Sequence, residues 1–136
     1  MYKLTTLVLP LLVIILFNGC TDDNDPVDLI DDRDAFIGTW NVNETCSKDA
    51  YTVTITKDPG NSSQVLIGNF WHVPFCQDLP YAIIAGKSMV IPQQSFCSNA
   101  FDVGGSGTLS KNKLTLSYTV SDGADEYKCT AFYEKQ

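Results

Sequence analysis

Apolar and polar residues alternate along the chain from Phe36 onward. β-branched and aromatic residues recur at every second position in short segments, and no segment has the spacing of an amphipathic helix. Strands are predicted at 36–45, 51–56, 64–70, 81–85, 88–91, 95–103, 107–110, 113–120 and 125–134, and the fifth and sixth are one bent strand if the chain runs on through Pro92. The pattern predicts an all-β domain, an antiparallel up-and-down meander of eight or nine strands.

Turn sequences set the register of three hairpins, and the turn at 111–112 brings Leu109 against Leu114. A two-residue turn at 86–87, with glycine first, places Ile84 opposite Met89. Continued outward past the intervening prolines, the same register sets Cys76 opposite Cys97, in the pair class where side chains approach most closely. This hairpin therefore predicts a disulfide.

The last two strands are expected to meet at the Asp-Gly turn of residues 122–123. A two-residue turn there sets Tyr118 opposite Tyr127 and Leu116 opposite Cys129. One face of this hairpin is apolar and the other polar, as in a sheet with one face on the core.

Four cysteines remain when Cys20 is set aside, and an even number in an exported chain indicates two disulfides. Spacing alone allows three pairings. If the first and last strands are neighbours in a closed meander, Cys46 reaches Cys129, which leaves Cys76 for Cys97. We predict those two pairs.

The N-terminus has the layout of a secretory signal peptide over residues 1–19. Lys3 precedes an apolar stretch at 4–17 that is too short to span a bilayer. The segment ending at Gly19-Cys20 resembles the lipobox of bacterial lipoproteins, which implies cleavage before Cys20 and its acylation by fatty acids such as palmitate. Two or more acyl chains form a lasting membrane anchor. The alternative is an ordinary signal peptide with an incidental cysteine.

Residues 20–35 are acidic, with seven aspartates against Arg33, and read as a flexible tether ahead of a domain at 36–136. An acidic stretch after the lipidated cysteine resembles a signal for display on the outer face of the outer membrane in some Gram-negative groups. A plain spacer is the alternative. From Phe36 onward seven lysines face nine acids, so a nucleic-acid partner is not expected.

Gly38-Thr39-Trp40 opens the first predicted strand and resembles the Gly-x-Trp motif of lipocalin-like barrels. The resemblance implies a small closed barrel in which Trp40 plugs the floor and Gly38 lets the chain pass closely. A basic residue near the last strand commonly packs on that tryptophan, and Lys128 or Lys135 are the candidates here. Short strands favour an interior filled by side chains over one that holds a small ligand.

An aromatic stretch between strands is the candidate binding surface. It comprises Phe70, Trp71, His72 and Phe75, with Tyr81 nearby. Exposed aromatics at one end of a barrel mark a binding surface or the mouth of a pocket. The alternative is that they cap the core.

No residue set specifies a reaction, a cofactor or a metal site. His72 is the single histidine, and a thiol–imidazole pair with Cys76 is lost if Cys76 is oxidised. The glycines of 104–107 lack the last glycine of a nucleophile elbow and read as a flexible approach to a strand, or a bulge. An enzyme is not expected.

The sequence thus favours a non-enzymatic lipoprotein of the outer membrane that binds a small apolar ligand or a surface partner. The alternative is a protein-binding accessory of the envelope that inhibits a hydrolase such as lysozyme.

Overall fold

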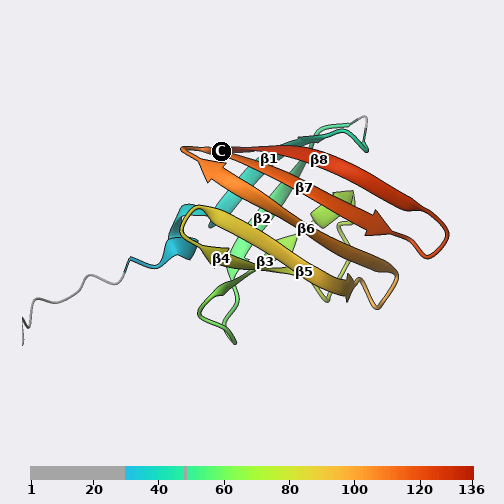
Figure 1. The fold of residues 1–136 in the computed structure, drawn as a ribbon, viewed down its shortest axis with the longest axis horizontal. Helices are drawn as coiled ribbons and strands as arrows, with labels where there is room; N and C mark the ends of the chain where they lie inside the picture. Colours follow the sequence, from blue (N-terminus) through green and yellow to red (C-terminus); the bar gives the residue numbers. More distant parts are fainter. Residues whose placement is uncertain (1–29, 48) are drawn as a thin grey trace, which may run out of the picture.

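The computed structural model describes residues 30–47 and 49–136, in which eight strands form one closed antiparallel barrel (Figure 1). The elements are η1 (Asp32–Ala35), β1 (Gly38–Glu44), β2 (Tyr51–Lys57), β3 (Gln64–Gly68), η2 (Phe70–His72), β4 (Tyr81–Ala85), β5 (Ser88–Phe96), β6 (Phe101–Ser110), β7 (Lys113–Ser121) and β8 (Glu126–Lys135). Neighbours in sequence are neighbours in the barrel, and β1 pairs with β8 to close it. The predicted all-β meander is confirmed.

The predicted fifth to seventh strands are redistributed into two. β5 continues through Pro92, with a register shift against β6 between Ile91 and Gln94. The chain then reverses at 97–100, where Cys97 and the next two residues all have positive φ of 55–60°. β6 therefore takes in both the end of the predicted sixth strand and the whole predicted seventh.

The predicted register holds at two hairpins, one of which pairs Leu109 with Leu114, and is wrong at the third. Ile84 pairs with Met89 as expected. In the β7–β8 hairpin, however, Tyr118 pairs with Cys129, because the connection is a four-residue loop at 122–125. The Asp122 carboxylate accepts backbone N–H groups at 3.0 and 2.8 Å inside this wider loop. The shift is two residues, so each side chain keeps its predicted face.

Both predicted disulfides are present. Cys46 bonds to Cys129 with Cα atoms 5.4 Å apart, and Cys76 bonds to Cys97 at 4.7 Å. Cys76 lies in the loop before β4, outside the β4–β5 ladder, so the second bond joins two loops rather than a continuous strand pair.

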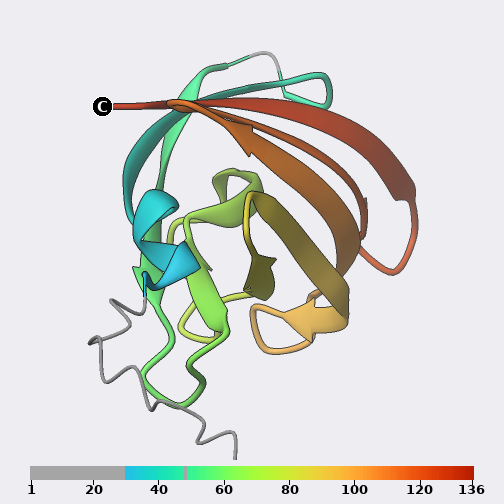
Figure 2. The ribbon, with the colours of Figure 1, turned by 60° about the vertical axis from the view of Figure 1, so that its left-hand side comes forward.

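The barrel has two different ends (Figures 1 and 2). The η1 end holds η1, the turns at 58–63, 86–87 and 111–112, and the C-terminus. The disulfide end holds the β1–β2 connection, the loop with η2, and the turns at 97–100 and 122–125. Both disulfides lie at the disulfide end.

Trp40 closes the η1 end. Its ring is fully buried, and its Nε1 donates to the Phe36 carbonyl at 2.9 Å. Lys135, rather than Lys128, lies over the ring, with Nζ 5.4 Å from the centroid. Gly38 has φ of +134°, which L side chains rarely adopt, and a Cβ there would lie 3.2 Å from the Lys135 side chain.

The folded unit begins before the predicted boundary at Phe36. The Arg33 guanidinium pairs with Asp31 at 2.7 Å and donates to the carbonyls of Asn61 and Gln64. The last residues of the predicted tether are thus packed against the β2–β3 turn. The predicted leader and Cys20 lie outside the described residues.

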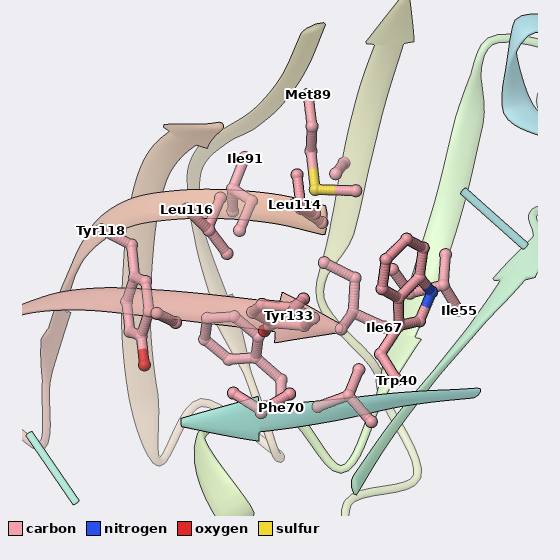
Figure 3. Close-up of a cluster of buried hydrophobic side chains, with 14 of the residues drawn as sticks. Trp40, Ile55, Ile67, Phe70, Met89, Ile91, Leu114, Leu116, Tyr118 and Tyr133 are labelled. Carbon is pink, nitrogen blue, oxygen red and sulfur yellow. The ribbon is translucent and has the colours of Figure 1, made fainter. Parts of the chain in front are cut away.

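Apolar side chains from all eight strands fill the barrel (Figure 3). Among those with no exposed surface are Trp40, Val42, Val53, Ile55, Val65, Ile67, Ala82, Met89, Val103, Leu116 and Ala131. In the part of the chain that the structure describes, no helix is long and apolar enough to cross a membrane.

Candidate functional site

One buried carboxylate interrupts the apolar interior. Among the described residues, Glu44 is the charged side chain that is buried, with 8% of its surface exposed. It is the last residue of β1 and follows Trp40 and Val42 on the inward face. The carboxylate therefore points into the core at the disulfide end.

Three tyrosines share this region with Glu44. The Tyr51 hydroxyl donates to Glu44 Oε2 at 2.9 Å, and the Tyr118 hydroxyl donates to the same oxygen. Glu44 Oε1 and the Tyr133 hydroxyl are buried without a hydrogen-bond partner. Burial, and then the nearby Glu44, raise the pKa of Tyr118 and Tyr133 well above the ordinary value, so both remain neutral.

The η2 segment covers this cluster. Phe70 is buried and packs on Tyr118, with ring centroids 4.9 Å apart. The His72 ring stacks on Tyr51 at 4.9 Å and 7°. Asn69 has positive φ and donates from its side chain to the Thr52 carbonyl at 2.7 Å, which ties the segment to β2. Figure 3 shows the rings of Phe70, Tyr118 and Tyr133 in the core.

The side chains of the predicted aromatic surface differ in burial. Phe70 belongs to the core, and Trp71 is half-buried against Phe101 and Tyr127, with centroids 5.3 and 5.4 Å apart. Phe75 is 92% exposed. The first half of the stretch therefore caps the core, and its second half reaches solvent.

His72 is exposed beyond its stacked face, and Tyr81 is half-buried at the start of β4. The Tyr81 backbone is held by the Gln94 side chain, which accepts its N–H at 3.0 Å and donates to its carbonyl at 2.8 Å. Tyr81 thus lies beside the register shift of β5 rather than with the η2 rings.

The loop that carries Phe75 is fixed at two points. Cys76 is bonded to Cys97, and both oxygens of the Asp78 carboxylate accept the backbone N–H of Ser98, at 2.7 and 2.8 Å. Phe75 is therefore presented on a stapled loop. The oxidised Cys76 also rules out the thiol–imidazole pair with His72.

Charge differs between the two ends. The described acids at the disulfide end, apart from buried Glu44, are Asp49, Asp78, Asp102, Asp122, Asp125 and Glu126. Lys128 is the described lysine there, and Lys48, also in the β1–β2 connection by sequence, lies outside the described residues. The other lysines, at 57, 87, 111, 113 and 135, lie towards the η1 end with Arg33. The disulfide end is strongly acidic although the domain is nearly neutral.

The glycines of 104–107 lie inside β6, not in a flexible approach to a strand. Gly105 pairs with Tyr118, and a Cβ there would lie 2.5 Å from the Ser117 carbonyl oxygen and the Tyr118 Cβ. The glycines let β6 approach β7 where Tyr118 turns inward. The register irregularity lies opposite, in β5.

Glu44 belongs to no motif in the sequence, so no role was predicted for it. Alternation along β1 places it on the same face as Trp40 and Val42, which was the available signal. Within the described residues, no group of three or more histidine, cysteine or acidic side chains is placed to hold a metal.

No protein-family model matches this sequence, and no curated protein is significantly similar to it.

Proposed function

We propose that this chain is a lipid-anchored, non-enzymatic binding module of the bacterial outer membrane, and that it recognises a protein partner through its disulfide end. The filled interior supports a surface partner over a small apolar ligand in the lumen, because large side chains from every strand occupy that volume. The contact of Trp40 with Lys135 agrees with the arrangement that the lipocalin resemblance implies.

The described chain enters the barrel at the end opposite the Phe75 loop. Ile30 follows Cys20 by ten positions and leads directly into η1. An acylated Cys20 then holds the η1 end towards the bilayer and directs the disulfide end away from it. This polarity suits recognition of a partner outside the membrane.

Phe75 is the observation that carries the proposal. Its side chain is 92% exposed on a loop fixed by a disulfide and by Asp78. Exposed aromatic side chains are typical anchors of interfaces, and a loop that is already ordered loses little conformational freedom on binding.

The acidic residues around this loop indicate a basic partner, because opposite charge speeds association and disfavours acidic competitors. The same charge favours the second candidate function, inhibition of a cationic secreted hydrolase such as lysozyme. Both candidates use the same surface.

The test compares two exposed phenylalanines. Phe75→Ser is expected to abolish binding to the partner, with lysozyme as the first protein to try, whereas Phe132→Ser on the side wall of β8 leaves binding unchanged. Surface plasmon resonance measures both, and circular dichroism melting checks that neither variant is destabilised. Equal binding by the two variants would contradict the proposed surface.

The anchor is tested separately. Cys20→Ser is expected to abolish incorporation of labelled palmitate and to release the protein from the membrane fraction. Unchanged incorporation in this variant would remove the lipoprotein part of the proposal. An apolar molecule retained by the native protein in mass spectrometry would instead favour a ligand inside the barrel.

A further inference from the structure

The buried carboxylate of Glu44 has hydrogen-bond partners on one of its two oxygens and none on the other. Glu44 Oε2 accepts two phenolic donors, from Tyr51 and Tyr118, while Oε1 accepts none. The Tyr133 hydroxyl, in a residue only 2% exposed, also lacks a partner. A buried polar atom without a hydrogen bond destabilises the fold, and more so if it is charged. Two such atoms in one cluster point to a ligand that donates to both.

The chemistry of the cluster selects among cations. An ammonium group has three donors and a compact positive charge, which suits one free carboxylate oxygen beside a hydroxyl. A guanidinium binds best to both oxygens of a carboxylate at once, and here Oε2 is already taken. A quaternary ammonium has no N–H donor and leaves the unpartnered atoms as they are.

The aromatic rings around Glu44 also favour a positively charged ligand. Tyr118 lies against Phe70, and Tyr51 is covered by His72, so aromatic groups border the carboxylate. Cations are attracted to aromatic faces, more strongly where water is excluded. Within the described residues, no arginine or lysine makes an ion pair with Glu44.

We propose that Glu44 and Tyr133 form a binding site for a small primary amine, with Tyr51, Tyr118 and the η2 rings as its walls. The ammonium group donates to Glu44 Oε1 and to the Tyr133 hydroxyl, which accounts for both unpartnered atoms. The filled interior restricts the ligand to a small one. Entry is from the disulfide end, where Glu44 ends β1. This site is independent of the Phe75 surface.

The test is a titration of the ¹⁵N-labelled protein with methylammonium chloride, followed by NMR at constant ionic strength maintained with potassium chloride. Saturable shifts are expected at the amides of Glu44, Tyr51, Tyr118 and Tyr133. Glu44→Gln keeps the side-chain shape and removes the charge, and it is expected to weaken binding at least about tenfold, since hydrogen bonds to charged groups are the stronger class. Tyr81→Phe, outside the cluster, is the matched control and is expected to bind as the unaltered protein does.

Tyr133→Phe provides a second test of the site if Glu44→Gln fails to fold. It removes one acceptor and leaves the ring in the core, so weaker binding with the charge intact is expected. Tetramethylammonium and guanidinium are expected to produce no saturable shifts at these amides. Equal affinity in the unaltered protein and Glu44→Gln, equal shifts from tetramethylammonium, or no saturable shift with methylammonium would each overturn the proposal.

Discussion

The two disulfides close loops of very different length, which leads to a quantitative prediction. Cys46 and Cys129 are separated by 83 residues, and Cys76 and Cys97 by 21. A disulfide stabilises in large part by restricting the unfolded chain, and the restriction grows with the logarithm of the loop length. Removal of the long-range bond is therefore expected to cost more.

The chain-entropy relation gives the size of the difference. At 25 °C it assigns about 4.6 kcal/mol to the 46–129 bond and about 3.4 kcal/mol to the 76–97 bond, a gap of about 1 kcal/mol. Lost packing contacts increase the difference in stability between the two variants. Cys129 is only 3% exposed, so loss of its sulfur also removes contacts in the core, whereas Cys76 and Cys97 are half-buried.

Urea denaturation of the protein lacking the predicted leader measures the difference. The two variants are Cys46→Ala/Cys129→Ala and Cys76→Ala/Cys97→Ala, each with the other disulfide intact. The free energy of unfolding is obtained by linear extrapolation, and mass spectrometry confirms which bond is present. A larger loss from the 76–97 variant would refute the reasoning. It would mean that order in the η2 loop, rather than restriction of the unfolded chain, dominates.

Two further predictions concern single residues. Gly105→Ala is expected to destabilise the protein by at least about 2 kcal/mol in urea denaturation, because its Cβ would overlap the backbone of β7 at Tyr118. The control is Ser106→Ala at an exposed position of the same strand. An equal loss of stability in the two variants would contradict the close approach of β6 and β7. Hydrogen bonds from Arg33 and Lys57 hold the pKa of Asp31 well below the ordinary 3.8, so the stabilisation is present above that value and is lost as the pH falls through the lower folded-state pKa. Asp31→Asn is expected to lower the melting temperature at pH 7, and the difference from the unaltered protein should shrink below pH 3.8; a constant difference would contradict the ion pair.

Alternation along each strand was enough to predict the all-β meander, because the side-chain period of a strand is a local property. Trp40 and the apolar face of the last hairpin, which includes Leu116, were expected to face the core, and turn signals paired Ile84 with Met89. The disulfide pairs followed from the register of the hairpin at 86–87 and from the assumption that the first and last strands are neighbours. Even the wrong register at 122–123 left each side chain on its correct face, because the shift was two residues.

The contacts of the candidate sites depended on the folded chain. Glu44, Tyr51, Tyr118 and Tyr133 come from four strands, and their meeting requires β1 to close against β8. Nothing local in the sequence distinguishes an inward glutamate that meets tyrosines from one at a strand end in solvent.

The docking of η1 and the division of the aromatic stretch were likewise tertiary outcomes. Arg33 is held by carbonyls of the β2–β3 turn, about thirty residues later in the chain. Phe70 packs inward while Phe75 remains exposed, within one short loop. The sequence alone determined which face of each strand is apolar. The closed barrel decided which polar groups meet inside it, because such contacts join residues distant in the chain.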